Sequence, residues 1–495
     1  MTTRDAEDAY DRAPYTDHAY AETHPDRLAV IAALSGWKSP PVETARILEI
    51  GCGRGGNLLP MAAHLPRATL TGVDASTRQI DEARAIAHAT SLANVTFHAT
   101  RFEDASMPDA SFDFVICHGV YSWVSVATRR ALLEAVARWL SPAGIAYVSL
   151  NTLPGWYERL AARDWIRFAA REGGEAARSA LTWLYDCVSP ERSGYRRHLG
   201  EVSARLRETG DAYLLHEYLA SEHRPESVST FLADAMGGGL SYLGDAVPAT
   251  VAVELLPERV QQRILGASVD EAQTIIDFVR GTAFRRALLV RADAAREASW
   301  TWAPTLDPRP IEGMWWASRL RNEADDLYRG PEGVVMVQNE TLRRALSELS
   351  SAAPGSLRHA ELAARSRVSP EVARDFLRDL ADLWLSTGGL DLSTREVQLA
   401  VREDLDGRPT ACRLARWHAT NGGPITNLLH QEVRLEDAAV RFVLERIDGT
   451  RTGRDLVKEV LASTFAAEDA APPAAAVSIV VRSLALLADA GLRLA

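Results

Sequence analysis

Short apolar runs alternate with helical patterns over the first third of the chain. Runs of five or six mainly apolar residues predict strands at 46–50, 68–73, 94–98, 112–117 and 145–150. Helical spacing predicts helices over 78–90 and 129–140, and an earlier one over 24–34 with Pro25 in its first turn. Strands of this length that alternate with helices predict a parallel, doubly wound α/β sheet.

The pattern changes after residue 156. Residues 157–236 show long helical patterns rich in Arg, Glu, Leu and Ala, and strand patterns return only at 240–246 and 284–290. We interpret the helical stretch as an insertion into the sheet, which the two later strands complete. Residues 293–331 contain Pro and Trp without clear periodicity, so we interpret them as a linker.

Two C-terminal units share one layout. Helices predicted at 340–350, 358–366 and 370–385, followed by short strand-like runs, have the order of a winged helix. A second unit follows, with helices predicted at 437–447, 453–461 and 477–491. The predicted domains are an N-terminal cap segment (1–44), an α/β core (45–156), a helical insertion (157–236), the completion of the sheet (237–292), the linker (293–331) and two winged-helix-like domains (332–404 and 405–495).

Composition narrows the class of protein. A chain of 495 residues with 47% hydrophobic and 24% charged residues can bury several cores. Its net charge of −11 disfavours general binding to nucleic acid or to anionic membranes. The four cysteines are scattered without metal-ligand spacing, the N-terminus lacks a secretory h-region, and no apolar run is long enough to span a bilayer. We therefore expect a cytoplasmic protein without a metal site or membrane segment.

The segment 47–57 (ILEIGCGRGGN) carries the strongest signal of a ligand site. Gly51, Gly53 and Gly55 follow the first strand in a turn that leads into a helix. Glycine permits a tight turn and lets the backbone approach a ligand without a Cβ clash. Dinucleotide-binding loops look similar, but Glu49 precedes this turn, and a carboxylate attracts an ammonium group whereas it repels a pyrophosphate. The turn favours a nucleoside ligand with an amino-acid tail.

Polar residues at the next two strand ends suit the nucleoside. Asp74 ends the second strand, where a carboxylate can accept from both ribose hydroxyls; it could instead cap the following helix, and we favour the ribose. Phe102 can stack on adenine, and Glu103 or Asp104 can accept from its amino group or simply form a solvated turn. The predicted cofactor contacts are Tyr15, Glu49, Gly51, Gly53, Gly55, Asn57, Asp74, Ala75, Arg101, Phe102, Glu103 and His118.

Aromatic and polar residues follow the fourth and fifth strands, in VICHGVYSWV (115–124) and SLNTLPGW (149–156). Ligands of open α/β sheets bind outside the carboxyl ends of the strands, so a reacting partner is expected there. The alternatives are that the aromatic residues pack on the next helix and that His118 is satisfied by a structural hydrogen bond. Predicted catalytic residues are His118, Tyr121, Trp123 and Asn151, and the predicted acceptor wall is Tyr121, Trp123, Trp156 and Tyr157.

At these residues the chain resembles bacterial class I S-adenosylmethionine-dependent methyltransferases with a methyltransferase regulatory domain. The resemblance rests on PYTDHAYAETHPDRLA, EIGCGRGGNLLPMA, FDFVICHGVYSWV and VSLNTLPGW, and on the later YLLHEYL, GLSYLGDA and NLLHQEVRLED. It covers nearly the whole chain. It implies a Rossmann-like seven-stranded sheet with an antiparallel edge, the cofactor S-adenosylmethionine and the product S-adenosylhomocysteine.

The family includes lysine methyltransferases that modify rickettsial outer-membrane proteins, so the resemblance also implies a protein or peptide acceptor. An aromatic pocket would lower the pKa of a lysine and hold its cation. Three alternatives stay open: a tailoring enzyme for a peptide natural product, a methyltransferase for small molecules, and a non-catalytic cofactor-sensing DNA-binding regulator, which the acidic balance disfavours. Winged helices also form dimer contacts in enzymes, so we include a homodimer among the expected partners.

Overall fold

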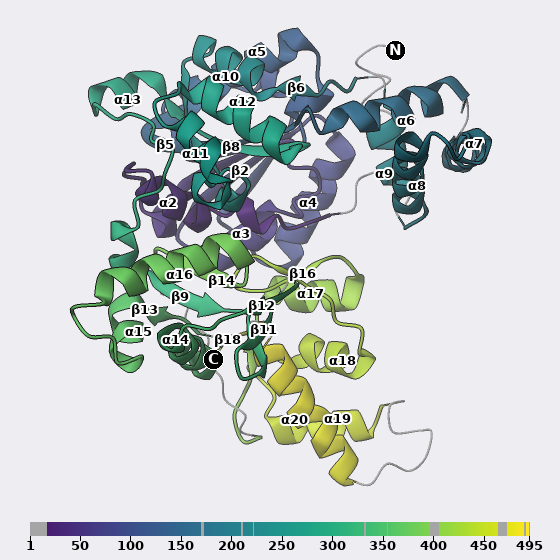
Figure 1. Cartoon of the computed structure of the whole chain (residues 1–495). Coiled ribbons are helices and arrows are strands. Elements are labelled where there is room, and N and C mark those ends of the chain that lie inside the picture. The colour runs from purple at the N-terminus through teal and green to yellow at the C-terminus, as the bar shows by residue number, and fades with distance from the viewer. Residues whose placement is uncertain are drawn as a thin grey trace.

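The central sheet has eight strands. Seven follow the order β3-β2-β1-β4-β5-β8-β7, and the two-residue strand β6 (Glu226–Ser227) pairs with β5 (Figure 1). In this computed structural model the described residues are 17–169, 173–208, 211–220, 222–330, 333–353, 355–396, 405–463, 473–489 and 492–494. The strands are β1 (Arg46–Ile50), β2 (Thr69–Asp74), β3 (Val95–Ala99), β4 (Phe112–Cys117), β5 (Leu140–Leu153), β7 (Leu240–Asp245) and β8 (Phe284–Arg291). The first five run parallel, and β8 is antiparallel to both β5 and β7. The predicted doubly wound sheet with an antiparallel edge is confirmed.

Helices cover both faces of this sheet because its central strands are apolar on both sides. All six residues of β4 are buried, as a parallel strand between two helical layers requires. One face packs on α2 (Pro25–Leu34), α3 (Leu58–His64) and α4 (Thr77–Ala89). The other face packs on α5 (Val126–Trp139) and α10 (Val228–Gly237), with α12 (Val269–Arg280) beside α10. The remaining helices of this domain are α11 (Glu258–Ile264) and α13 (Ala292–Glu297).

The helical insertion is shorter than predicted. It contains α6 (Trp156–Ala169), α7 (Gly173–Cys187), α8 (Ser193–Glu208), α9 (Asp211–Leu214) and the π-helical turn η5 (Leu215–Leu219). These helices share a small core of their own and stand to one side of the sheet (Figure 1). The prediction that the insertion reaches residue 236 is wrong, because β6 (Glu226–Ser227) pairs with β5 and α10 packs in the core of the sheet.

The predicted linker at 293–331 is also wrong over most of its length. It contains β9 (Trp315–Ser318), β10 (Arg321–Ala324) and β11 (Leu327–Gly330), and β11 pairs with β12 (Gly333–Met336). β9 is the central strand of the sheet β13-β9-β14, in which β13 is Leu357–Arg358 and β14 is Leu390–Ser393. Trp316 is fully buried there, against a core shared with α14 (Glu340–Ala352), α15 (His359–Arg365) and α16 (Ala373–Thr387). A four-residue strand is too short for its alternation to show in sequence.

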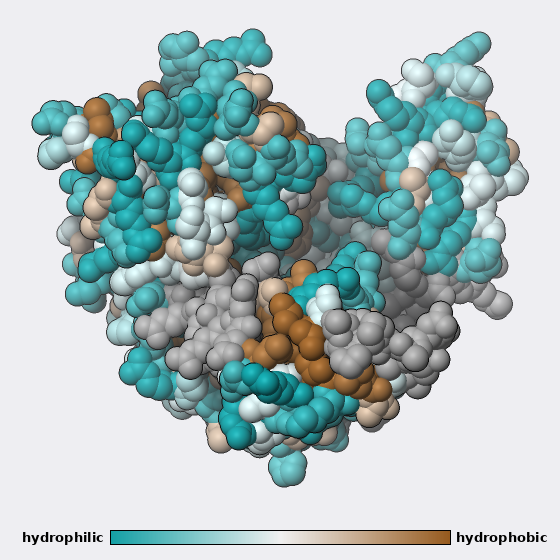
Figure 2. Space-filling model, turned by 90° about the horizontal axis from the view of Figure 1, so that it is seen from below, coloured by the Kyte–Doolittle hydropathy of each residue, from teal (hydrophilic) through white to brown (hydrophobic). Residues whose placement is uncertain are grey.

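The C-terminal module, residues 405–494, forms the lower part of the molecule in Figure 1. Its helices are α17 (Arg413–Asn421), α18 (Ala438–Arg446), α19 (Gly453–Leu461) and α20 (Pro473–Asp489), which share one core. Its short strands are β15 (Thr410–Ala411), β16 (Ile425–Thr426), β17 (Glu432–Val433) and β18 (Arg493–Leu494). Seen from below, its surface is mostly hydrophilic with one apolar strip (Figure 2). None of the described helices has the length and apolar character needed to cross a bilayer.

Arg285, on β8, is a buried cation of the sheet domain, with 1% of its surface exposed. It donates to Asp277 at 2.8 Å and to the side-chain oxygen of Gln273 at 2.8 Å. Replacing it by Met leaves the Asp277 carboxylate buried without its cation, a loss of about 3–5 kcal/mol. We expect R285M to lower the thermal unfolding midpoint by several degrees in calorimetry. R309M, which removes an exposed partner of Asp307, is the control; an equal midpoint for both variants would contradict the prediction.

Candidate active site

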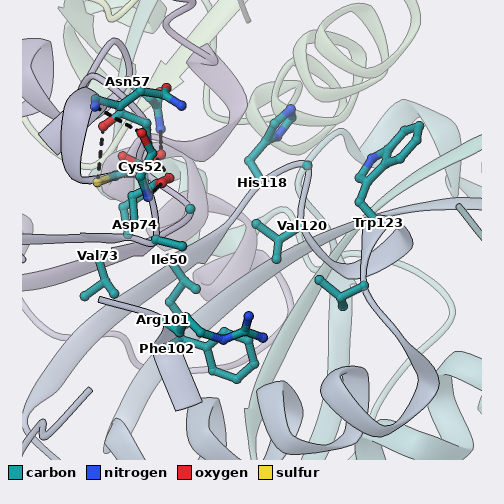
Figure 3. A pocket seen from close by; sticks show the side chains of 18 of the residues that line it. Ile50, Cys52, Asn57, Val73, Asp74, Arg101, Phe102, His118, Val120 and Trp123 are labelled. Atoms are coloured by element: carbon teal, nitrogen blue, oxygen red, sulfur yellow. Dashed lines mark hydrogen bonds between the residues drawn. The ribbon is translucent and has the colours of Figure 1, made fainter. Parts of the chain in front are cut away.

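A cavity of about 530 Å³ opens at the carboxyl ends of β1, β2, β4 and β5. Its volume lies in the usual range for small-molecule sites. The loop that follows β1, residues 51–57 (the first loop), lies on one side of the cavity. His118 and Trp123 lie on the other side, with Val120 between them (Figure 3). Because parallel strands end at one edge of the sheet, residues at or just after the ends of β1 to β5 meet here.

The glycine turn is held in a conformation that requires glycine. Gly51, Gly53 and Gly55 have φ angles of +76°, +51° and +80°. At Gly51 an added Cβ would come within 2.5 Å of Val120 Cγ2, so the loop that follows β4 lies directly against the turn. The backbone N–H of Gly53 donates to Asp74 Oδ2 at 2.9 Å, which joins the turn to the end of β2. The turn therefore presents bare backbone to the cavity.

Glu49 is the buried acid of the site, with 3% of its surface exposed. Its Oε1 accepts from Asn57 Nδ2 at 2.8 Å, whereas its Oε2 has no hydrogen-bond partner among the described residues. Burial raises the pKa of Glu49 to about 8, against the opposing effect of the Asn57 hydrogen bond. A buried carboxylate oxygen without a partner is costly unless a ligand satisfies it, and the fitting ligand is a cation.

Asp74 and Phe102 line the nucleoside part of the cavity together with Ala75, Arg101 and Glu103. Asp74 does not cap α4: Ser76 does, by accepting from the N–H of Gln79, and Asp74 Oδ1 accepts from the N–H of Ser76. Phe102 is buried, with 8% of its surface exposed. Arg101 donates to Glu103 at 3.0 Å, so the predicted amino-group acceptor is engaged in an ion pair.

His118 stands at the middle of the cavity, among aromatic rings. Its Nδ1 lies 2.8 Å from the hydroxyl of Tyr147, and its ring stacks on Tyr20 with 3.7 Å between centroids. Desolvation lowers the pKa of His118 to about 4, so the ring is neutral near pH 7. Sequence reasoning missed Tyr20, although this residue belongs to the opening segment on which the family resemblance rests.

The far end of the cavity combines an aromatic ring with polar groups. It is lined by Trp123, Asn151, Glu217 and Glu222, and the two glutamates come from the helical insertion and the loop that follows it. Asn151 Nδ2 lies 2.9 Å from His223 Nε2, and the ring of His223 lies 4.3 Å from Trp123. Sequence reasoning did not select Glu217, Glu222 or His223 as residues of the site.

Four predicted site residues among the described ones lie outside the cavity lining. One is the predicted cofactor contact Gly55, which lies against Leu59 and Phe97. The other three belong to the predicted aromatic wall, which needs correction. Tyr121 is fully buried and donates to Glu226 at 3.0 Å. Trp156 is buried behind His223, and Tyr157 is 58% exposed on the outer side of α6. The strand-end pattern gave the position of these rings along the chain but not their direction. The predicted cofactor contact Tyr15 lies outside the described residues.

Comparisons with known proteins place three parts of the chain in described families. Residues 47–144 match a methyltransferase domain, residues 210–291 a predicted methyltransferase regulatory domain, and residues 407–475 the PKMT C-terminal winged helix domain. Protein RP028 of Rickettsia prowazekii is 35% identical over 217 residues, which cover 43% of this chain and 87% of that protein. This chain belongs to the class I S-adenosylmethionine-dependent methyltransferases with a regulatory domain.

Further likenesses extend the comparison. Protein RP789 of Rickettsia prowazekii is 34% identical over 291 residues, so the match spans 57% of this chain and only 53% of that relative. The structure of PKMT2 from Rickettsia typhi covers 97% of this chain with a TM-score of 0.85 and 24% identity, and this chain covers all of it. PKMT2 has also been solved in complex with AdoHcy. The likeness to PKMT2 shows that the fold is shared over nearly the whole chain.

The residues of the cavity fit the cofactor of this methyltransferase family. S-adenosylmethionine carries an ammonium group, a ribose and an adenine, and its sulfonium supplies an activated methyl group. The unpartnered oxygen of Glu49 suits the ammonium, the carboxylate of Asp74 suits the ribose hydroxyls, and Phe102 offers an apolar face to the adenine. The bare backbone at Gly51 and Gly53 leaves room between these groups.

Cofactor binding is expected to depend on pH through Glu49. The raised pKa means that free Glu49 is protonated below about pH 8, and a ligand ammonium must displace that proton to pair with the carboxylate. Affinity for S-adenosylhomocysteine should therefore rise between about pH 6 and about pH 8, where α-amino groups themselves begin to lose their proton. Calorimetry in two buffers of different ionisation enthalpy should detect proton release at about pH 6.5.

The matched variant is Glu49→Gln, which keeps the shape of the side chain but cannot ionise. E49Q should bind S-adenosylhomocysteine about 10- to 100-fold more weakly, because a charge-assisted hydrogen bond is lost, and should release no proton. Glu134→Gln, on the exposed face of α5, controls for a general change of charge. Unchanged affinity and unchanged proton release in E49Q would exclude Glu49 as the partner of the ammonium group.

Proposed function

We propose that this methyltransferase transfers a methyl group to the side-chain amine of lysine in a protein or peptide. The observation that carries the proposal is the lining of the cavity, which includes Glu217, Glu222 and Trp123. The Trp123 ring lies beyond His118 as seen from the cofactor residues (Figure 3). Carboxylates and an aromatic face together suit a cationic acceptor on an apolar stem. An acid or phenol acceptor would meet like charge there.

In this proposal each part of the cofactor site binds a different part of S-adenosylmethionine. Glu49 binds the ammonium group, the backbone around Gly51 and Gly53 follows the amino-acid tail, and Asp74 binds the ribose. Phe102 packs against the adenine. These roles place the sulfonium near His118, because His118 lies between the cofactor residues and the acceptor end (Figure 3).

The residues of the chain do little covalent chemistry in this scheme, because alignment and exclusion of water carry most of the rate. A lysine ammonium, with a reference pKa of about 10.4, must lose a proton before it can attack. Burial against Trp123 and Tyr20 removes water from the amine and lowers its pKa. Neutral His118 and the amide of Asn151 then orient the amine by hydrogen bonds.

Access for a polypeptide is supported by the shape of the molecule. The helical insertion, which carries α6, α7 and α8, stands to one side of the sheet domain (Figure 1). Glu217 and Glu222 come from this side of the cavity. The likeness to PKMT2 and the match to the PKMT winged helix domain support a protein acceptor for this chain as well.

Small-molecule acceptors are the second candidate. The aklanonic acid methyltransferase DauC of a Streptomyces is 34% identical over 113 residues, and a fatty-acid O-methyltransferase of Mycolicibacterium smegmatis is 31% identical over 160 residues. These matches span only 22% and 30% of this chain. They support a shared cofactor domain more than a shared acceptor, because most of the chain lies outside them.

Incubation of the protein with a bacterial lysate and methyl-labelled S-adenosylmethionine tests the proposed acceptor. Label should enter protein, survive mild base, and be recovered as methyl-lysine after total hydrolysis. E49Q, at a cofactor concentration that saturates only the wild type, supplies the matched control. Label confined to small molecules, or released by mild base as a methyl ester would be, contradicts the proposal.

A lysine-containing peptide that the protein methylates allows a test of one of the two carboxylates, that of Glu222. Glu222→Gln removes one exposed negative charge from the acceptor end. We expect KM for the peptide to rise about two- to fivefold, because exposed ion pairs are weak, while the Kd of S-adenosylhomocysteine stays constant. Glu201→Gln, on the exposed side of α8, is the control. Equal KM values for the two variants would separate Glu222 from acceptor binding.

A further inference from the structure

The C-terminal module reaches the back of the cofactor site through a tight hairpin. The turn 427–431 (NLLHQ) joins β16 to β17, and within it the backbone N–H of Asn427 donates to the carbonyl of Gln431. His430 lies at the tip with a φ of +58° and is fully buried against the sheet domain. Its ring lies 5.4 Å from that of His24, at the start of α2. The hairpin is therefore inserted between segments that are more than 350 residues away in sequence.

His430 contacts the residue that holds Glu49. Its Nε2 lies 2.9 Å from Asn57 Oδ1, and the same oxygen accepts from the backbone N–H of Tyr20 at 3.0 Å. Asn57 Nδ2 donates to Glu49 at 2.8 Å and to Thr23 Oγ1 at 3.0 Å. Both donors and both acceptor positions of the amide are thus used, which leaves one orientation for Asn57. That orientation directs the amide N–H to Glu49.

The hairpin also holds the segment that closes one side of the cavity. Asp17, His18 and Tyr20 line the cavity, and a Cβ at Gly56 would come within 2.6 Å of Asp17, so this segment lies directly on the first loop. Glu432, on β17, accepts from the N–H of Ala19 at 2.9 Å and lies 2.9 Å from His18 Nδ1. Two residues of the hairpin therefore reach two parts of the cofactor site.

We propose that the hairpin 425–433 is a part of the cofactor site, in which His430 is a positioning residue that orients Asn57 and, through it, Glu49. Glu432 adds to this by holding the segment 17–20 over the cavity. Docking of the C-terminal module and binding of the cofactor are then coupled, each favouring the other by the same factor. The inference rests on the proposed role of Glu49 but not on the identity of the methyl acceptor.

The local chemistry of His430 supports a specific hydrogen bond over simple packing. Burial, together with His64 and Arg27, lowers the pKa of His430 and keeps the ring neutral, so it has one N–H to donate. Its Nδ1 has no partner among the described residues, and the left-handed backbone adds strain. An apolar residue would avoid the cost of burying an unpartnered nitrogen. The hydrogen bond to Asn57 is the gain that offsets it.

Other contacts keep the module in place when His430 changes. Arg413, on α17, donates to the hydroxyl of Ser91. Gln431 donates at 3.3 Å to Asp391, on β14, which also accepts from Arg27 of α2 at 2.7 Å. Loss of His430 therefore removes one interaction from a larger interface. This redundancy lets the positioning effect be separated from docking as a whole.

The test measures binding of S-adenosylhomocysteine to the full-length chain by calorimetry. His430→Ala should raise Kd about five- to tenfold, the equivalent of one buried hydrogen bond. His430→Gln, whose amide N–H can reach a similar position, should recover part of this loss. Arg413→Ala weakens the same module interface without touching Asn57 and should leave Kd unchanged. Thermal unfolding of each variant shows whether the chain remains folded.

A measurement on the unmodified protein guards against an unfolded variant. Saturation with S-adenosylhomocysteine should slow amide hydrogen exchange in the turn 427–431, because coupling is reciprocal. Any of three results overturns the inference. The first is a native Kd for S-adenosylhomocysteine in folded H430A, and the second is an equal rise of Kd in R413A. The third is amide hydrogen exchange in the turn that S-adenosylhomocysteine leaves unchanged. None of these readouts involves methyl transfer, so failure to find a lysine acceptor would leave them standing. Failure of E49Q to weaken binding would instead remove the proposed role of Glu49.

Discussion

The burial of one acidic side chain, Glu49, is the constraint around which the cofactor site is arranged. It sits at the end of β1 with 3% of its surface exposed and one oxygen without a partner among the described residues. A buried carboxylate with a single hydrogen bond is costly, and the raised pKa shows that the free protein avoids that cost by keeping the group protonated. Only a cationic ligand makes the ionised form favourable. The glycine turn beside it gives such a ligand a backbone surface without side chains, so the acid and the turn depend on each other.

The sequence was sufficient for the parts of the site that local structure determines. The strands β1 to β5, the glycine turn and Asp74 follow from short apolar runs and fixed spacing. The structure places Glu49, Gly51, Gly53 and Asp74 in one cavity. The sequence was insufficient where the direction of a side chain, or a contact with a residue far away in the chain, determines the structure. The side chains of Tyr121 and Trp156 point into the protein interior, where Tyr121 contacts Glu226 and Trp156 contacts His223. Neither contact can be inferred from a periodic sequence pattern. The linker prediction failed similarly, since the role of β9 depends on strand partners 41–43 and 72–78 residues later in the chain.

The two ends of the cavity come from different parts of the chain, and this separation has a consequence for specificity. The cofactor end is built on β1, β2 and the turn η3 (Phe102–Asp104) that follows β3, whose positions the rigid sheet fixes. At the acceptor end, Glu217 and Glu222 come from the insertion and its return to the sheet. Arg129, on α5, holds the return from the insertion against the sheet domain, because it is fully buried, lies 2.9 Å from Glu226 and donates to the carbonyl of Arg224. Substitutions in the insertion can therefore alter the acceptor without disturbing the cofactor residues, as long as this contact holds the loop in place.

The N-terminal segment links these two ends to the rest of the molecule. Tyr20 stacks on His118, where the cofactor and acceptor parts meet, while its backbone N–H donates to Asn57 beside Glu49. The same segment receives Glu432 from the C-terminal module. A short stretch that contacts the reacting region, the buried acid and a distant module at once has few alternative conformations when all three contacts form. Its order is therefore a property of the whole chain, because the sheet domain alone supplies only part of the hydrogen bonds that hold it.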